Sequence, residues 1–108
     1  MWPSFLRGWW QRLYPASLPH LRVILYTRQG CHLCDDAWLL LQAIRQRHGF
    51  SLDSVDVDRD SALAARFGEQ VPVVEVNGKV RFWGRINPVL LERLIRAEAR
   101  PIRDEPRP

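Results

Sequence analysis

The stretch Val23-Ile24-Leu25-Tyr26-Thr27-Arg28-Gln29-Gly30-Cys31-His32-Leu33-Cys34 decides the fold of this chain. It begins with an apolar run that is typical of a buried strand, and a helical pattern follows its first cysteine directly. The sequence therefore places two thiols at a turn from a strand into a helix. A Cys-x-x-Cys pair in this setting is typical of a redox site. The first thiol of a new helix lies near unpaired backbone N–H groups and the positive end of the helix dipole, so we expect its thiolate to be stabilised.

Length and cysteine content limit the classes of protein to be considered. The 108 residues are enough for one domain with its own core, and two cysteines are too few for a disulfide framework. A membrane-spanning helix would need about 20 consecutive apolar residues, and the sequence has no such run. The first 20 residues also lack the uninterrupted apolar core of a secretory signal. We therefore expect a cytoplasmic protein, in which a close cysteine pair is catalytic or metal-binding rather than structural.

The net charge of +4 does not indicate a nucleic-acid partner. Residues 1–20 carry +2 and residues 100–108 carry +1, whereas residues 21–99 hold eleven basic and ten acidic side chains. Fifteen of the sixteen basic residues are arginines, and they are mixed with acids along the chain. Nucleic-acid binding usually needs a concentrated basic face, so we expect no nucleic-acid partner.

Residues 1–20 form a Trp-rich extension in front of the domain. Its apolar residues recur at spacings of three and four, which predicts an amphipathic helix. We interpret this segment as an extra helix that covers the domain. Contact with a membrane surface and a disordered extension are the alternatives, and we rank both below the covering helix. The residues of the apolar pattern are Trp2, Phe5, Leu6, Trp9, Trp10, Leu13 and Tyr14.

Residues 21–99 show the regular pattern of an α/β domain. Strands are predicted over 22–27 and 50–57, with a helix between them that starts at 31 or 32 and ends near 47. A short helix is predicted over 60–67. These elements make up a βαβ unit followed by one more helix.

A hairpin and a final helix complete the predicted domain. Asn77-Gly78 suits a tight two-residue turn between strands at 73–76 and 79–83. Asn87-Pro88 then opens the last helix, with Asn as N-cap and Pro at the first helical position. Residues 100–108 contain charges and three prolines and are predicted to be a disordered tail.

The order of elements, with a Cys-x-x-Cys after the first strand and Val71-Pro72 before the third, resembles the glutaredoxin-like branch of the thioredoxin fold. The resemblance covers about residues 21–98 and is greatest to small bacterial glutaredoxin-like proteins. It implies a thioredoxin-like α/β fold with a four-stranded mixed β-sheet flanked by helices. Residues 25–34 are similar to a glutaredoxin active-site strand and turn. Residues 82–87 lack the Gly-Gly pair with which glutathione-using members hold the γ-glutamyl end of glutathione.

The two cysteines have distinct predicted roles. Cys31 at the start of the helix is the candidate nucleophile, because an exposed thiolate is the species that attacks a disulfide. Cys34 lies one helical turn further on and is the candidate resolving cysteine. His32 between them would favour the thiolate when protonated and is a candidate for tuning the redox potential; the alternative is an exposed residue without a role. Asp35 and Asp36 act against the thiolate by their negative charge.

Four further residues are candidates for substrate binding through the resemblance. Pro72 would be the family's cis-proline, and the backbone of Val71 would pair with an extended substrate strand. Arg28 resembles the basic residue that contacts the glycine carboxylate of glutathione in glutaredoxins. Arg85 would serve a second carboxylate or a peptide. For both arginines the alternative is an exposed side chain without a partner.

We therefore expect a thiol–disulfide oxidoreductase that acts in cell redox homeostasis and holds no bound cofactor. Its substrate would be a disulfide-containing protein or a low-molecular-weight disulfide, and glutathione or a thioredoxin-reductase-type donor would supply the electrons. A non-catalytic binding module and a dithiol metal-binding protein are the alternatives. A closed zinc site needs four ligands, and beyond the two cysteines the chain offers only His20, His32 and His48 as histidines. We predict no metal ligands.

Overall fold

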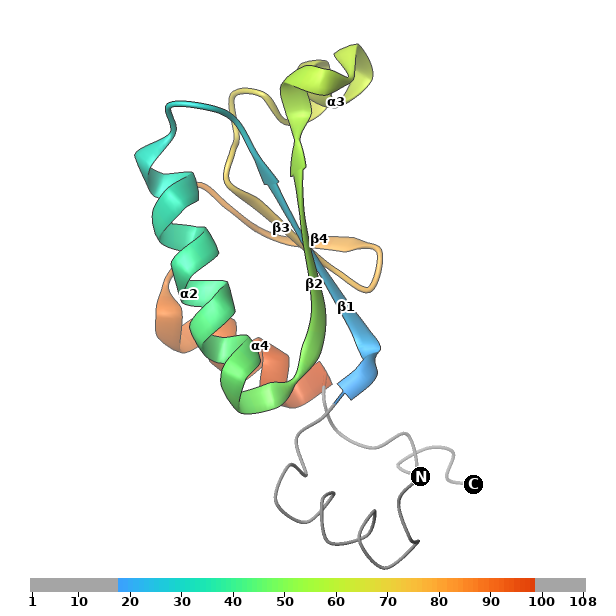
Figure 1. Ribbon diagram of the computed structural model, residues 1–108, viewed down its shortest axis with the longest axis vertical. Coiled ribbons are helices and arrows are strands. Elements are labelled where there is room, and N and C mark those ends of the chain that lie inside the picture. Colours follow the sequence, from blue (N-terminus) through green and yellow to red (C-terminus); the bar gives the residue numbers. More distant parts are fainter. Residues whose placement is uncertain (1–17, 99–108) are drawn as a thin grey trace, which may run out of the picture.

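The computed structural model describes residues 18–98, which form one four-stranded sheet and three α-helices (Figure 1). The strands are β1 (Leu18–Thr27), β2 (Phe50–Asp56), β3 (Val73–Val76) and β4 (Lys79–Trp83), and they lie in the order β2-β1-β3-β4. β1 and β2 are parallel, whereas β1 pairs with β3, and β3 with β4, in antiparallel fashion. The predicted thioredoxin-like mixed sheet is confirmed.

Two helices, α2 (His32–His48) and α4 (Pro88–Glu98), cover one face of the sheet. Gly49 ends α2 in the left-handed conformation that glycine adopts without a steric penalty. Asn87 begins α4 and accepts hydrogen bonds from the amides of Val89 and Leu90, as its predicted N-cap role requires. Between these helices and the sheet lie the buried residues of the main core: Leu21, Val23, Leu25, Ala37, Leu41, Ile44, Phe50, Val74, Val76, Leu91 and Ile95.

A short 3₁₀ turn, η1 (Val57–Arg59), and helix α3 (Ser61–Phe67) lie at the end of the sheet where β1 and β2 finish. Val57, Phe67 and Val73 form a second, smaller core there. Asp60 caps α3 by accepting hydrogen bonds from the amides of Ala62 and Leu63. The turn between β1 and α2 that carries Cys31, here called the dithiol turn, and the segment before β3 therefore lie at the same end of the domain.

The hairpin turn has the predicted geometry, with φ of 50° at Asn77 and 87° at Gly78. The start of the first strand was predicted at residue 22, and this was wrong, since β1 begins at Leu18 and passes through Pro19. The register of β1 against β2 is irregular between Leu18 and Arg22, and pairing with β3 starts only at Val23. A proline that has no N–H to donate is tolerated in such an irregular segment.

The remaining boundaries agree with the prediction, as in β3 and β4, or differ from it by one residue. β2 ends at Asp56 instead of 57 because Val57 opens η1, and α2 extends to His48. The predictions of an amphipathic helix over 1–20 and of a disordered tail over 100–108 fall essentially outside the described residues. Within residues 18–98, no helix is long and apolar enough to cross a membrane.

Candidate functional site

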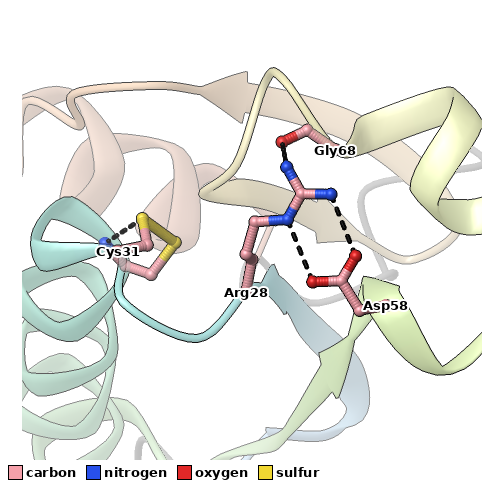
Figure 2. The surroundings of a disulfide bond; sticks show 5 residues. Arg28, Cys31, Asp58 and Gly68 are labelled. Carbon is pink, nitrogen blue, oxygen red and sulfur yellow. Dashed lines mark hydrogen bonds and ion pairs between the residues drawn. A yellow bond between two sulfur atoms is a disulfide. The ribbon is translucent and has the colours of Figure 1, made fainter.

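The two cysteines lie at the N-terminus of α2 and are joined in a disulfide (Figure 2). Cys31 is the N-cap residue with an extended backbone, and its Sγ accepts a hydrogen bond from the amide of Cys34 at 3.1 Å. Its carbonyl also accepts from the amides of Cys34 and Asp35, each at 3.1 Å. The sulfur of Cys31 therefore occupies the place of a capping side chain, where the free N–H groups of a helix stabilise negative charge.

The two sulfurs differ in exposure. Cys31 is half-buried, whereas Cys34 is only 1% exposed and belongs to the buried side of α2. The Cα atoms are 5.2 Å apart, within the range of ordinary disulfides. Cys31 is therefore accessible from the solvent in this structure, whereas Cys34 is not.

The polar side chains of the first helical turn lie at the surface. His32, Asp35 and Asp36 are all exposed. In the described part of the chain, no group of three or more His, Cys, Asp or Glu side chains is arranged to hold a metal ion.

The segment Val71-Pro72 leads into β3, and its peptide bond is cis. Pro72 is buried and Val71 is half-buried. The amide of Val71 donates to the carbonyl of Phe67 at 3.1 Å, and the carbonyl of Pro72 accepts from the amide of Gly84 at 2.8 Å. The carbonyl of Val71 accepts no hydrogen bond from residues 18–98.

Arg28 lies three residues before Cys31, but its guanidinium is occupied within the protein (Figure 2). Nε and Nη2 donate to the two carboxylate oxygens of Asp58 at 3.0 and 2.9 Å, and Nη1 donates to the carbonyl of Gly68 at 2.8 Å. The hydrogen bond and charge of Asp58 raise the pKa of Arg28, and Arg28 in turn lowers the pKa of Asp58. The pair is therefore ionised over the whole physiological range.

The comparisons with known proteins agree with this geometry. Residues 22–96 match the family model described as Glutaredoxin-like domain (DUF836). The chain belongs to the glutaredoxin-like family.

Solved structures place the chain in the same fold. A structural-genomics target from X. campestris, XcR50, is 31% identical, with a TM-score of 0.60 over 69% of this chain and 96% of that chain. Protein Ne2328 from Nitrosomonas europaea is 21% identical, with a TM-score of 0.60 over 68% and 89% of the two chains. A mutant thioredoxin from Halobacterium salinarum is 18% identical, with a TM-score of 0.61 over 76% and 77%. The last two show the fold alone.

Arg85 of this glutaredoxin-like domain lies beside the dithiol turn rather than at a distance from it. It is exposed and lines a cavity of about 190 Å³ between α2 and the loop before α4. The opposite wall includes Leu33, the residue between the two cysteines, and Asp36. In the described residues Arg85 has no ion pair. Most of the lining is apolar, and the full set is Leu33, Asp36, Ala37, Leu40, Arg85, Ile86 and Pro88.

Sequence reasoning missed Asp58 and Gly68, the two partners of Arg28. A signal for Asp58 was present, because parallel strands bring their carboxyl ends to the same edge of a sheet. Thr27 at the end of β1 is in register with Asp56 at the end of β2, so residues 28 and 58 follow neighbouring strands. No sequence pattern pointed to the carbonyl of Gly68.

Proposed function

We propose that this glutaredoxin-like protein is a thiol–disulfide oxidoreductase that reduces disulfides by a dithiol mechanism. The supporting observation is the contrast between its two sulfurs. Cys31 is reachable and held at a helix N-terminus, while Cys34 is buried within bonding reach of it. This is the arrangement that a nucleophile and its resolving cysteine need.

The reaction has two exchange steps. The thiolate of Cys31 attacks one sulfur of the substrate disulfide; a mixed disulfide forms, and the other substrate sulfur leaves as a thiolate that takes up a proton. Cys34 then loses its proton and attacks Sγ of Cys31. The mixed disulfide breaks, the second substrate thiol is released, and the protein is left with the Cys31–Cys34 disulfide. Two electrons have passed from the protein to the substrate.

Two features at the same end of the domain as Cys31 would bind the substrate. The carbonyl of Val71 would accept a hydrogen bond from an extended peptide, as in strand addition, with Pro72 forming the buried floor of the segment. The cavity between α2 and the loop before α4 would take an apolar side chain near the reacting cysteine, and Arg85 at its wall would attract a carboxylate. His32, exposed beside Cys31, would tune the potential when protonated.

The oxidised protein must be reduced for a further cycle. Glutathione or a thioredoxin-reductase-type partner would supply the two electrons, and no bound cofactor takes part. We propose the cytoplasm as the site of action, where glutathione and thioredoxin systems keep thiols reduced.

Trapping of the mixed disulfide tests this mechanism. The reduced Cys34→Ser variant is expected to accumulate a covalent complex with a peptide disulfide through Cys31, detected by intact-protein mass spectrometry. The Cys31→Ser variant should form at least tenfold less complex, because the remaining thiol is 1% exposed. Equal adducts in both variants, or none in either, would contradict the assignment of nucleophile and resolving cysteine.

A further inference from the structure

The contacts of Arg28 join three segments that are distant in the sequence. Arg28 follows β1, Asp58 lies in η1 after β2, and Gly68 follows α3. Each segment lies at the end of the sheet that carries the dithiol. Both edges of the guanidinium are used, since the Nε–Nη2 edge holds the carboxylate and Nη1 holds the carbonyl. We call this arrangement the Arg28 clamp.

The clamp connects the nucleophile to the segment that offers the carbonyl of Val71. Arg28 and Cys31 belong to the same short turn. On the other side, the amides of Gln70 and Val71, shortly after Gly68, both donate to the carbonyl of Phe67 at 2.8 and 3.1 Å. The amide of Gly84 donates in turn to the carbonyls of Gln70 and Pro72 at 3.1 and 2.8 Å. A shift of Gly68 would therefore move the substrate-binding backbone relative to Cys31.

Gly68 is also the residue that this close approach requires. A Cβ atom at position 68 would lie 2.5 Å from the carbonyl oxygen of Ala64 and 2.9 Å from Nη2 of Arg28. The φ of Gly68 is −53°, so the glycine is needed for space and not for an unusual backbone conformation. Its absent side chain lets the guanidinium reach the carbonyl.

The strength of the ion pair does not explain the arrangement by itself. The side chains of Arg28 and Asp58 are 37% and 48% exposed, and exposed ion pairs contribute little to stability. The main effect of the pair is on geometry. The planar guanidinium of Arg28 makes two parallel hydrogen bonds to the Asp58 carboxylate, and such a pair of bonds fixes the direction as well as the distance between the two groups.

We propose that Arg28 is a positioning residue that sets Cys31 against the carbonyl of Val71, and that it does not bind a substrate carboxylate. This inference rests on the proposed oxidoreductase function. It also narrows the substrate class. The charge of Arg28 is already paired with Asp58, so a substrate carboxylate gains no binding energy at this position. An extended peptide disulfide that bonds to Val71 is therefore favoured as substrate over a small anionic disulfide.

Two variants separate positioning from carboxylate binding. Arg28→Lys keeps the charge and loses the fork; Asp58→Asn keeps Arg28 and releases it from its partner. If Arg28 positions the site, both variants should raise KM for an extended peptide disulfide by about tenfold, since small misplacements of reacting groups have large kinetic effects. Turnover of hydroxyethyl disulfide, which is uncharged and too small to reach Val71, should change less than twofold.

The control is Arg47→Gln. It removes an equally bidentate pair, Arg47 with Glu92 at 2.8 Å through both nitrogens, at the other end of α2. This variant should leave both substrates unaffected. A lower KM for glutathione disulfide in Asp58→Asn would overturn the proposal, because a released Arg28 would then be binding a carboxylate. Wild-type kinetics in Arg28→Lys would overturn it as well.

Amide hydrogen exchange makes the test independent of turnover. The clamp predicts faster exchange at Gln70 and Val71, and at the amides of the dithiol turn, in both Arg28→Lys and Asp58→Asn, with no change in Arg47→Gln. If wild type reduces no disulfide but exchange follows this pattern, the oxidoreductase proposal fails and the positioning role of the clamp stands. Unchanged amide exchange in both Arg28→Lys and Asp58→Asn would overturn the positioning role of Arg28, whatever activity these variants show.

Discussion

The amide of Cys34 donates a hydrogen bond to Sγ of Cys31 across one turn of α2, at 3.1 Å. The buried cysteine thus supplies a backbone donor to the sulfur of the more accessible one. Charge that develops on Sγ of Cys31 when the disulfide opens would meet this N–H group at once.

Alkylation should distinguish the two thiols of the reduced protein. With limiting iodoacetamide near neutral pH, we expect Cys31 to be modified at least tenfold faster than Cys34, because Cys31 is half-buried at the helix start and Cys34 is 1% exposed. Peptide mass spectrometry after proteolysis measures the ratio. Equal rates would mean that the reduced protein does not keep Cys34 covered.

Arg85→Ala tests the cavity next to Leu33. We expect KM for an acidic peptide disulfide to rise by about three- to tenfold, with kcat unchanged, because an exposed charge acts mainly on encounter and ground-state binding. Arg93→Ala, at an exposed position of α4, is the matched control and should have no effect. A loss of kcat alone in Arg85→Ala would place this residue in the chemistry instead of in substrate binding.

Glu92 makes the stability of the domain depend on pH in the acidic range. Hydrogen bonds from Arg47 and His48, and the nearby charge of Arg96, lower the pKa of Glu92 from 4.5 to about 2. A lowered pKa in the folded state stabilises the protein above the ordinary pKa of the carboxyl, and this stabilisation is lost as the pH falls from about 4.5 towards 2.

Glu92→Gln should therefore lower the melting temperature at pH 7, and the difference from wild type should shrink as the pH falls below about 4. Thermal unfolding followed by circular dichroism from pH 7 to pH 2.5 measures it. A difference that stays constant with pH would show that the carboxylate charge contributes nothing.

Tyr26 makes the stability of the domain depend on pH in the alkaline range. Burial, followed by the hydrogen bond to Glu75 at 2.7 Å, raises its pKa from 10.0 to about 12. A raised pKa in the folded state means that this contribution is complete below pH 10 and is lost as the pH rises towards 12.

Tyr26→Phe should cost about 1 kcal/mol at neutral pH through the lost hydrogen bond. The ring contact with Phe67, at 4.6 Å between centroids, would remain. The variant should also lose less stability than wild type between pH 10 and 12. Urea unfolding at pH 8 and at pH 11 provides both comparisons, and a parallel decline of the two proteins would contradict the assignment of Tyr26.

The sequence predicted the elements well where a local pattern determines them. The dithiol turn, the Asn77-Gly78 hairpin and the Asn87 cap each depend on a few adjacent residues, and the structure has them at these positions. The start of β1 was misjudged because the apolar run of a buried strand begins only after Pro19, whereas the strand extends back to Leu18 through an irregular pairing with β2.

The site was less predictable because its geometry comes from long-range contacts. Arg28 looked like a free cation in the sequence, and its partner lies 30 residues away in η1. The backbone of Val71 was also expected to be free to pair with a substrate strand, but its amide donates to the carbonyl of Phe67, the last residue of α3. The contact of Arg28 with Asp58 has no local signature, because it depends on the register of β1 against β2.

The redox equilibrium of Cys31 and Cys34 tests the central claim most directly. The protein would be equilibrated in defined glutathione buffers, acid-quenched, alkylated and counted by mass spectrometry. We predict a reversible internal disulfide with a midpoint between about −180 and −270 mV, the range of known thiol–disulfide oxidoreductases of this fold. If both thiols remain reduced across the whole range, the dithiol is not a working redox centre and the proposed function is wrong.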